Sequence, residues 1–348
     1  MRIAVLFGGI STERNVSISG GRAVVEALRS LGYDVVPVDP AFGKDGQIKA
    51  EEHINNVNHF NTLDELKMFS PKSIIECINS EIFDNIDCAF IVLHGKYGED
   101  GIIQSLLELR GIPYTGSGVK ANAISIDKAT TKNLMLVAGI PVPAGTLVTP
   151  ETAVEFEVIK EIRNEFGNEL VIKPNDQGST IGLTIVRDGN LDEISRGIAE
   201  AGKYCRDVLI EQYIDGREIT VGIVGDEALP VIEIIPESGF YDYEHKYTKG
   251  KTQYVCPAEI DEDIAEFVKG LSITAHNVLG CSGFSRVDFR LTDEGQPYFL
   301  EINTVPGFTA TSLVPKAAKQ IGIEFPELCE RIIKLAINNK NKTNKKVV

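Results

Sequence analysis

Residues 285–303 read SRVDFRLTDEGQPYFLEIN, and this stretch decides what kind of fold the chain can form. Two runs of strand-forming residues flank Asp293-Glu294-Gly295-Gln296, a polar segment with a glycine that is typical of a turn. Because side chains alternate between the two faces of a strand, Arg286, Asp288 and Arg290 lie on one face of the first strand. The stretch therefore predicts a β-hairpin with one polar face.

The register of this hairpin decides which polar residues meet. A four-residue loop places Asp288 opposite Glu301 and Arg286 opposite Asn303, and puts Phe299 on the polar face with Glu301. A five-residue loop would put the two polar sets on opposite faces. Two facing carboxylates repel each other, and carboxylate and amide oxygens suit a hard cation such as Mg²⁺. On the hairpin alone, a magnesium site and a solvated polar face neutralised by Arg286 are both open interpretations.

Apolar runs alternate with helical patterns over roughly the first 120 residues, which predicts an open parallel sheet. Strands are expected at 2–7, 33–38 and 87–93, and helices at 16–31 and 102–110. Residues 40–80 are polar, and we expect a peripheral insertion with one or two helices there.

From about residue 127 the strands are separated by close turns, which predicts a mostly antiparallel α+β region. Helices are expected at 127–138, 312–321 and 326–338, and strands at 169–173, 182–186, 208–212, 219–224, 228–235, 285–291 and 297–303. The C-terminal residues NNKNKTNKKVV are polar and basic, and we expect them to be disordered.

Length and charge narrow the class of protein. The 348 residues suggest two or three domains, and a hydrophobic fraction of 43% is enough for sizeable cores. The chain has 35 Lys and Arg against 50 Asp and Glu, a net charge of −15. This argues against a general nucleic-acid binder, which needs clustered cations, although an anionic small ligand remains compatible with a few well-placed cations or metal ions.

The location is inferred from what the sequence lacks. The N-terminal run breaks at Gly8-Gly9 and has no signal-peptide cleavage pattern, and no stretch approaches the roughly 20 apolar residues of a membrane span. The six cysteines have no CxxC pair, and the five histidines are not spaced as zinc ligands. We therefore expect a cytoplasmic protein with reduced, mostly buried thiols and no contact with membranes.

Two lysines and a glycine-rich turn suggest a phosphate site in the middle of the chain. Lys173 ends an apolar run, and the segment NDQGSTIG at 175–182 leads into another strand. Backbone amides in such a turn can bind phosphate, and the arrangement indicates a strand–loop–strand lid and not a P-loop. An ordinary hairpin with a solvated lysine is the alternative, and Lys128 alone is a weaker indication still.

The N-terminal loop leaves several interpretations open. Gly8-Gly9 lies between a strand and a helix, where helix amides can meet an anion. The GxGxxG fingerprint fails, yet Asp39 after the second strand keeps a nicotinamide-dependent dehydrogenase as a rival. Glu13 could meet a substrate ammonium or simply favour the helix start, and His94 could contact a ligand or pack in its loop. The segment 236–258 is long enough to be functional or mobile.

Eight motifs, taken together and in order, resemble the D-alanine–D-alanine ligases of the ATP-grasp superfamily. Each motif is modestly specific, whereas eight in order with compatible spacing are highly specific, and they cover nearly the whole chain except 40–80 and the tail. The motifs are GGISTERNVSISG (8–20), HGKYGEDG (94–101), PYTGSGVKANAISIDK (113–128), VIKPNDQGSTIG (171–182), EQYIDGRE (211–218), FYDYEHKYTKGKTQYVCPA (240–258), GFSRVDF (283–289) and EINTVPGFTATSLVPKAA (301–318).

The resemblance implies a three-domain ATP-grasp architecture of class α/β and α+β. The expected divisions are 1–126 for a Rossmann-like substrate-binding domain, 127–217 for a central lid, 218–340 for a catalytic domain and 341–348 for a disordered tail. ATP is expected between the antiparallel sheets of the last two domains. A homodimer is implied by the resemblance alone.

The resemblance also assigns roles to residues by their positions. It implies that Lys128, Lys173 and Lys246 bind the phosphates. Glu211 and the backbone of Gln212, Tyr213 and Ile214 would bind the adenine, and Glu218 the ribose. Asp288, Glu301 and Asn303 would bind two Mg²⁺ ions, or Mn²⁺. The catalytic residues it implies are Glu13, Ser179, Tyr247, Arg286, Gly307 and Ser312. The substrate residues it implies are Glu13, His94, Arg286, Ser312 and Leu313.

The implied reaction joins two D-alanines for peptidoglycan synthesis. The first carboxylate attacks the γ-phosphate to form an acyl phosphate, and the second amine then displaces phosphate. Arg286 and the amide of Gly307 stabilise the oxyanion. Glu13 holds the first ammonium and is linked to Ser179 and Tyr247, and closure excludes water.

Departures from the family pattern are small. The lid reads NDQGST where many relatives have two serines after the glycine, and Asn15 replaces a common glutamate. Tyr247 favours an amine nucleophile, because the relatives that use D-lactate lack it, while D-serine remains an alternative second substrate. A nicotinamide-dependent oxidoreductase and a catalytically dead nucleotide-binding protein are the rivals from other classes.

Overall fold

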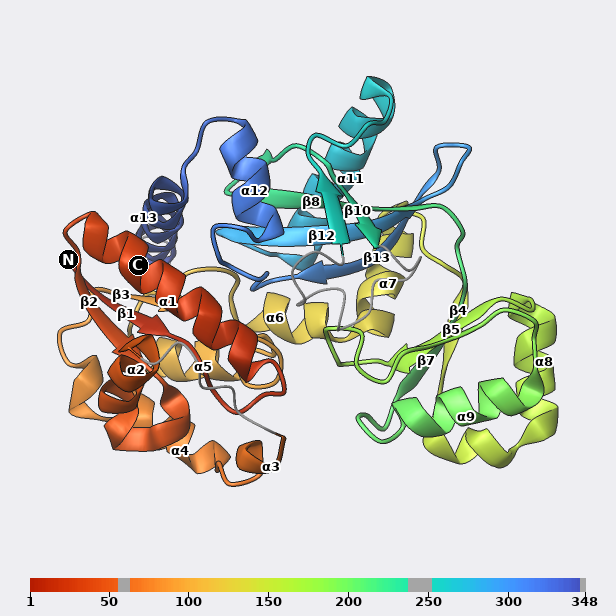
Figure 1. Cartoon of the computed structure of the whole chain (residues 1–348), viewed down its shortest axis with the longest axis horizontal. Coiled ribbons are helices and arrows are strands. Elements are labelled where there is room, and N and C mark those ends of the chain that lie inside the picture. The colour runs from red at the N-terminus through yellow and green to blue at the C-terminus, as the bar shows by residue number, and fades with distance from the viewer. Residues whose placement is uncertain (56–62, 237–251, 345–348) are drawn as a thin grey trace.

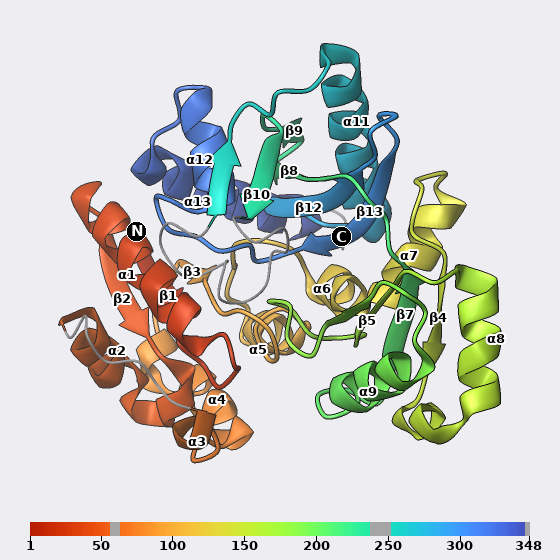
Figure 2. The ribbon, with the colours of Figure 1, turned by 45° about the vertical axis from the view of Figure 1, so that its right-hand side comes forward.

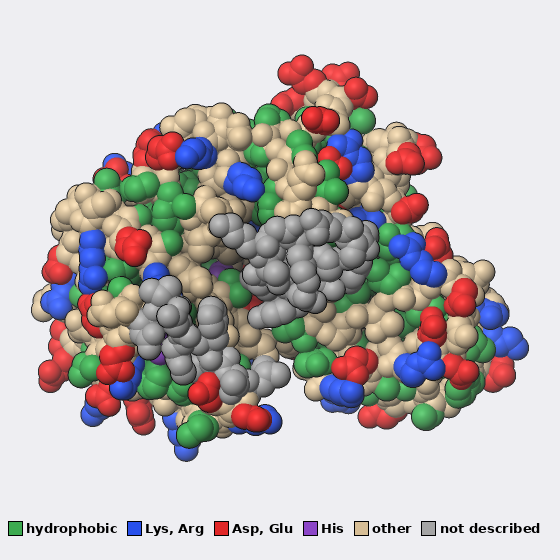
Figure 3. All heavy atoms as spheres, viewed as in Figure 1, with side chains coloured by type: hydrophobic (Ala, Val, Ile, Leu, Met, Phe, Trp, Pro, Cys, Tyr) green, Lys and Arg blue, Asp and Glu red, His purple; other side chains and the backbone are tan. Residues whose placement is uncertain are grey.

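The computed structural model describes residues 1–55, 63–236 and 252–344 of the chain, which form three sheets. The parallel sheet lies at one end, a four-stranded sheet at the other, and a six-stranded sheet between and above them (Figure 1). No helix in the described ranges is long and apolar enough to cross a membrane. Side chains of both charges are interspersed over the face in Figure 3.

The N-terminal sheet is parallel, as predicted, with strand order β2-β1-β3. Its strands are β1 (Arg2–Leu6), β2 (Asp34–Val38) and β3 (Cys88–Ile91). Alternate residues of β1 face opposite cores: Ile3 and Val5 pack with α1 (Arg14–Ser30) and α13 (Phe325–Asn344), whereas Ala4 and Leu6 pack with α4 (Pro71–Ile78) and α5 (Ile102–Leu109). Both faces of the sheet are therefore buried, as parallel sheets require.

The polar insertion contains more helix than predicted. It forms η1 (Pro40–Asp45), α2 (Gly46–Asn55), α3 (Leu63–Leu66) and α4, followed by η2 (Glu81–Phe83). The expectation of one or two helices is wrong. Short capped helices lack the long repeat of apolar residues by which a helix is recognised in a sequence. The helix α4, for example, begins with Ser70 accepting a hydrogen bond from the amide of Lys72 and with Pro71 in its first turn.

The four-stranded sheet has order β4-β7-β5-β6 and is antiparallel throughout. Its strands are β4 (Gly145–Val148), β5 (Leu170–Pro174), β6 (Thr184–Val186) and β7 (Val208–Gln212). Leu170 and Ile172 face a core formed with η3 (Pro150–Val154), α8 (Phe156–Phe166) and α9 (Leu191–Ala201). The intervening Val171 and Lys173 face the opposite side, which is the wall of a pocket.

The six-stranded sheet has order β11-β10-β8-β12-β13, with β9 beside β8, and is also antiparallel. Its strands are β8 (Arg217–Val224), β9 (Glu227–Ala228), β10 (Ile232–Pro236), β11 (Thr252–Val255), β12 (Phe284–Leu291) and β13 (Pro297–Asn303). One face packs on α6 (Val119–Ile126), α7 (Lys128–Val137) and α11 (Glu262–Leu279), and α12 (Leu313–Gln320) lies against β8 and α13 (Figure 2). The strand predicted at 228–235 is two strands, since Pro230 between them has no amide to donate.

The polar residues of the decisive hairpin pair as predicted. Asp288 of β12 lies opposite Glu301 of β13, and Arg286 lies opposite Asn303. All four come together at the end of the hairpin that is far from its turn.

The loop of the hairpin differs from the prediction. The last pair is Leu291 with Pro297, so five residues separate the strands, and the register shifts at a β-bulge in which Leu300 is the extra residue. The bulge cancels the extra loop residue. Phe299 is consequently buried in the core against Phe289, with ring centroids 6.0 Å apart, and not on the polar face.

The C-terminal helix α13 runs to Asn344, so the expectation of disorder is wrong for 341–344. No glycine or proline follows Pro326 to end the helix. Residues 345–348 of the predicted tail lie outside the described residues. All six cysteines are free thiols, and Cys77, Cys88, Cys281 and Cys329 are buried, as expected.

Candidate active site

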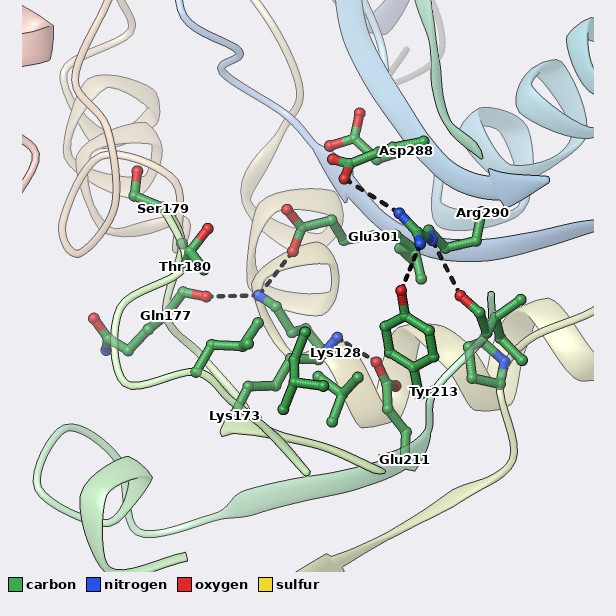
Figure 4. Close-up of a pocket in the computed structure, with 18 of the residues that line it drawn as sticks. Lys128, Lys173, Gln177, Ser179, Thr180, Glu211, Tyr213, Asp288, Arg290 and Glu301 are labelled. Carbon is green, nitrogen blue, oxygen red and sulfur yellow. Dashed lines mark hydrogen bonds and ion pairs between the residues drawn. The ribbon is translucent and has the colours of Figure 1, made fainter. Parts of the chain in front are cut away.

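One pocket lies between the four-stranded and the six-stranded sheets and encloses about 1010 Å³ of space, part of it open to solvent (Figure 4). Eleven of the predicted nucleotide, metal and substrate residues line it: Lys128, Lys173, Ser179, Glu211, Gln212, Tyr213, Ile214, Glu218, Arg286, Asp288 and Glu301. The structure thus brings together residues that lie up to 173 positions apart, as from Lys128 to Glu301.

Lys128 is the point where the lid and the carboxylate hairpin meet. It is the first residue of α7, whose start is capped by Asp127 through a bond from the amide of Thr130. Its Nζ donates to the carbonyl oxygen of Gln177 at 2.8 Å and lies 3.2 Å from Glu301 Oε2 (Figure 4). Lys128 is buried. Its charge has an oxygen partner on the lid, at Gln177, and another on the hairpin, at Glu301.

Glu211 is held between two lysines on the opposite wall. Lys173 Nζ lies 2.5 Å from Oε1 and Lys132 Nζ lies 2.9 Å from Oε2. Burial by itself raises the pKa of Glu211, but Lys132 and Lys173 outweigh it and leave the pKa below its ordinary value. Lys132 was not among the residues predicted from the sequence, although its position four residues after Lys128 on a helix places both lysines on one face.

The facing carboxylates of the hairpin are neutralised by cations, as Coulomb repulsion requires. Arg286 donates to both oxygens of Asp288, from Nε at 2.8 Å and from Nη2 at 2.7 Å. Asp288 also accepts from the hydroxyl of Thr220 at 2.6 Å and from the amide of Asn303 at 3.0 Å. Thr220 is a further contact that the sequence analysis did not find, because it comes from the neighbouring strand β8.

The same donor set fits a hard divalent cation. Asp288 and Glu301 offer carboxylate oxygens toward the pocket, and Asn303 offers a side-chain amide from beside Asp288. Oxygen donors of this kind are the ligands that Mg²⁺ prefers, with phosphate oxygens completing its octahedron.

Arg290 organises the end of the pocket at which adenine and ribose were predicted. Its Nε donates to the carbonyl oxygen of Ile214 at 3.1 Å and its Nη2 to the hydroxyl of Tyr213 at 2.9 Å, and Nη1 lies 3.8 Å from Glu218 Oε2 (Figure 4). The guanidinium of Arg187 covers the Tyr213 ring at 3.7 Å from its centroid. The segment that follows β7 is thus fixed to both sheets.

The lid reaches the N-terminal domain through a hydrogen bond from the Ser179 hydroxyl to Glu13, the link that the family resemblance implied. Both side chains are buried. Ser179 has a φ of 53° and Thr180 a φ of 62°, a left-handed conformation that is costly for a β-branched residue. Tyr247, the third member, and Lys246 lie outside the described residues.

His94 is buried next to the segment that follows β13, and not in the wall of the nucleotide pocket. Its Nδ1 lies 2.9 Å from the carbonyl oxygen of Val305. Burial lowers the pKa of His94, and Glu13 opposes that shift. Glu99, which the sequence analysis quoted only within a motif, accepts from the amides of Gly95 at 2.7 Å and Val305 at 3.1 Å. Burial, with Glu13 nearby, raises the pKa of Glu99 to about 8.

Gly307 and Ser312 lie between β13 and α12, Leu313 begins α12, and none of the three is in the described pocket wall. A Cβ at Gly307 would lie 3.7 Å from Ser312 Oγ, which accepts from the amide of Thr309 at 2.9 Å. Leu313 is the first residue of α12, so its amide points out of the helix start.

Asp39 does not have the role that a dehydrogenase would give it. It is fully buried and paired with Arg14, whose Nη2 lies 2.6 Å from Asp39 Oδ2. It also accepts from the amides of Gly9 and Ala41, both at 3.1 Å. With its oxygens used in this way, Asp39 is not available to a ribose, and the nicotinamide-dependent alternative loses its main support.

The fold and site define a class of protein. Two antiparallel sheets that face each other across a pocket, with Lys173 on one, Asp288 and Glu301 on the other and Lys128 on the helix beside them, form the nucleotide site of an ATP-grasp enzyme. Two family models match the chain, the D-ala D-ala ligase N-terminus over residues 2–117 and the D-ala D-ala ligase C-terminus over residues 134–334. The chain belongs to the D-alanine–D-alanine ligase family.

Relatives of this family match over nearly their whole lengths. A D-alanine–D-alanine ligase of Desulforamulus reducens is 43% identical over 345 residues, covering 97% of this chain and 99% of the relative. The crystal structure of the Bacillus anthracis enzyme complexed with ATP is 32% identical, with a TM-score of 0.75 and 99% of each chain covered. A D-Ala:D-Ser ligase of Enterococcus faecalis is 32% identical, with a TM-score of 0.77, and covers 97% of this chain and 99% of its own.

Proposed function

We propose that this chain is an ATP-dependent ligase that joins two D-alanines into D-alanyl-D-alanine, with release of ADP and phosphate, for peptidoglycan precursor synthesis. The observation that carries the proposal is the convergence of Lys128, Lys173, Arg286, Asp288 and Glu301 in one pocket between two sheets. Its cations and carboxylates match what phosphoryl transfer needs, which is positioning and charge neutralisation.

Lys128 and Lys173 bind the ATP phosphates in this proposal, together with Lys246 from outside the described residues. Asp288, Glu301 and Asn303 would hold two Mg²⁺ or Mn²⁺ ions, which would supply neutralisation of phosphate charge.

The other end of the pocket receives the nucleoside. Glu211 and the backbone of 212–214 meet the adenine, and Glu218 meets the ribose. The support is positional: the segment lines the pocket and is fixed by Arg290. A carboxylate that stays ionised is an acceptor for the exocyclic amino group of adenine.

The first D-alanine is held at the junction of the lid with the N-terminal domain. Glu13 accepts from its ammonium, with Ser179 and Tyr247 completing a linked set that closes over the site, and His94 lies beside it. The carboxylate of this D-alanine attacks the γ-phosphate and gives an acyl phosphate and ADP. Closure excludes the water that would hydrolyse that intermediate.

The second D-alanine is positioned by Ser312 and Leu313 at the start of α12, where free backbone amides and the helix dipole favour a carboxylate. Its amine attacks the acyl carbon, and phosphate leaves with the bonding electrons. Arg286 and the amide of Gly307 stabilise the oxyanion of the tetrahedral step.

The division into domains at 1–126, 127–217 and 218–340 remains part of the proposal, as do a homodimeric assembly and a cytoplasmic location. The three sheets lie one in each of these ranges, except that β8 begins one residue before the last boundary, at Arg217, and this distribution supports the division.

The decisive experiment follows phosphate release by the purified protein with ATP, Mg²⁺ and one acceptor at a time: D-alanine alone, or D-alanine with D-serine or D-lactate. We expect turnover with D-alanine alone, and identification of the dipeptide by mass. Release that requires D-serine or D-lactate would replace the assigned second substrate, and no release with any of them would contradict the proposed function.

A further inference from the structure

Lys132 is a buried lysine that lies behind the nucleotide pocket. It is on α7, its side chain is 6% exposed, and its Nζ lies 2.9 Å from Glu211 Oε2 and 3.4 Å from the carbonyl oxygen of Phe299. Among the described residues, the pocket wall includes Lys128, Lys173 and Glu211 but not Lys132. Glu211 is the pocket-lining side chain that Lys132 contacts, so Lys132 can act on a bound nucleotide through that carboxylate.

Burying the charge of Lys132 costs free energy, which raises the question of what the charge does. Burial lowers the pKa of Lys132 to about 8, and the charge of Glu211, 2.9 Å away, opposes the shift and favours the charged amine. Buried ion pairs contribute little to stability compared with well-packed apolar residues. Met135, almost one turn further along α7, is buried in the same core and shows that an apolar side chain fits this helix face.

The two lysines at Glu211 differ in what else they can reach. Lys173 lines the pocket and is the residue proposed to bind phosphate, yet in this structure its Nζ lies 2.5 Å from Glu211 Oε1. When Lys173 turns toward a phosphate, Glu211 keeps a cationic partner only if Lys132 stays in place. Lys132 is not among the residues that line the pocket, so it has no comparable phosphate to turn toward.

We propose that Lys132 is a positioning residue that holds Glu211 as a fixed carboxylate acceptor, and that it thereby sets the preference for a 6-aminopurine nucleotide over a 6-oxopurine nucleotide. The inference rests on the proposed contact of Glu211 with adenine. A carboxylate accepts a hydrogen bond from the amino group of adenine, whereas the oxygen at the same position of guanine is itself an acceptor and is repelled. If Glu211 is protonated or turned away, this discrimination is lost.

The test uses three variants of the full chain: Lys132→Met, which removes the charge; Lys132→Arg, which keeps it; and Asn133→Met, a control at the exposed neighbouring position. The binding of the non-hydrolysable analogues AMPPNP and GMPPNP with Mg²⁺ is measured by calorimetry, and kcat/KM is measured with ATP and GTP. We expect Lys132→Met to reduce the preference for the adenine nucleotide by about 10-fold or more, mainly through KM. Lys132→Arg should restore most of the preference, and Asn133→Met should leave it unchanged.

A double-mutant cycle with Glu211→Gln separates positioning from a general loss of packing. In the Glu211→Gln background, Lys132→Met should change the adenine preference less than twofold, because the group through which Lys132 acts is gone. Thermal unfolding monitors the fold, and Lys132→Gln, which retains a polar group, replaces Lys132→Met if that variant does not fold. Equal weakening of both nucleotides in the lysine variants, or additive effects in the cycle, overturns the inference.

Failure of the proposed function would look different. Wild-type protein would then release no phosphate with D-alanine, whereas calorimetry, which needs no D-alanine, would still report the effect of Lys132 on nucleotide preference. A wild-type protein that binds AMPPNP and GMPPNP equally well would overturn the inference directly.

Discussion

Two Arg–Asp pairs in this molecule have nearly the same geometry and different surroundings. In the N-terminal domain, Arg14 donates to both oxygens of Asp39 at 2.6 Å and 3.1 Å. In the six-stranded sheet, Arg286 donates to both oxygens of Asp288 at 2.7 Å and 2.8 Å. Both are bidentate pairs, the strong form of a charge-assisted hydrogen bond.

The first pair, Arg14 with Asp39, is fully buried, and we call it the sealed pair. The side chains of Arg14 and Asp39 are 1% and 0% exposed, and the guanidinium lies over the rings of Phe42 and Phe69 at 5.5 Å and 4.9 Å. Burial would raise the pKa of Asp39, but hydrogen bonding to His53 and the charge of Arg14 outweigh it and hold the pKa below its ordinary value.

The second pair opens onto the pocket. Arg286 and Asp288 are 14% and 9% exposed, and both line the nucleotide site. In the proposed function, Asp288 exchanges its arginine partner for a metal ion, and Arg286 then binds substrate. The comparison teaches that the same ion pair fixes a fold when water and ligands are excluded, and serves chemistry when another charged partner can reach it.

The sealed pair should produce the largest effect on folding. Asp39→Ala leaves Arg14 buried without its counterion, and we expect the free energy of unfolding to fall by about 3–5 kcal/mol. Urea denaturation measures it. The matched control is Asp84→Ala, which removes the partly exposed pair with Arg110 and should cost less than about 1 kcal/mol. Equal losses in the two variants would break the comparison.

Removing a carboxylate beside the pocket should lower the activity of the protein and leave its fold intact. Glu301→Ala removes a carboxylate proposed to bind metal, and we expect kcat for phosphate release to fall about 100-fold or more, since metal coordination contributes several kcal/mol to the transition state. Asp293→Ala in the hairpin turn is the control for a lost carboxylate. Turnover at the wild-type level, or a Mg²⁺ dependence unchanged by Glu301→Ala, would remove Glu301 from the metal site.

His276 is a buried side chain for which the described residues show no ion pair, and it tests the comparison through the pH dependence of the free energy of unfolding. Burial lowers the pKa of His276 to about 4, and its Nδ1 lies 2.7 Å from Ser285 Oγ. The unfolded chain binds this proton at its ordinary pKa near 6.5 and the folded chain does not, so stability is lost as pH falls. We expect His276→Gln to abolish a loss of about 2 kcal/mol between pH 7 and pH 5. Identical pH profiles of unfolding in wild type and variant would contradict this.

The lid contact should produce the smallest effect. Ser179→Ala removes the hydrogen bond to Glu13 across the closed site, and we expect KM for the first D-alanine to rise about 10-fold, with a smaller change in kcat. Gln177→Ala keeps the backbone carbonyl that Lys128 contacts and is the matched control on the same lid. Steady-state kinetics with varied D-alanine distinguish the two, and an unchanged KM in Ser179→Ala would exclude a role for the link in substrate binding.

Much of the fold and site could be predicted where the pattern is local. The parallel sheet, the antiparallel region and the pairing of Asp288 with Glu301 follow from apolar runs and from alternation along strands. The hairpin loop was predicted wrongly, because a bulge at Leu300 leaves no mark in an alternating sequence. The helices of the insertion and the end of α13 were missed for a similar reason, since short or polar helices carry a weak period.

The residues that escaped prediction act across large sequence separations. Lys132 meets Glu211, Thr220 meets Asp288, and Glu99 meets the amide of Val305. No spacing in the chain indicates these contacts, because each depends on how two elements are placed in space.

The sequence by itself determined which groups this protein has for its chemistry: the lysines, the carboxylates of the hairpin and the glycine-rich lid. The tertiary structure alone decided which of its charged pairs are sealed and which are open. Asp39 and Asp288 are both aspartates with an arginine partner, and nothing in the sequence around Asp39 tells that two phenylalanines cover Arg14. The physical reason is that a buried charge takes its properties from every element packed around it, whereas sequence patterns describe one element at a time.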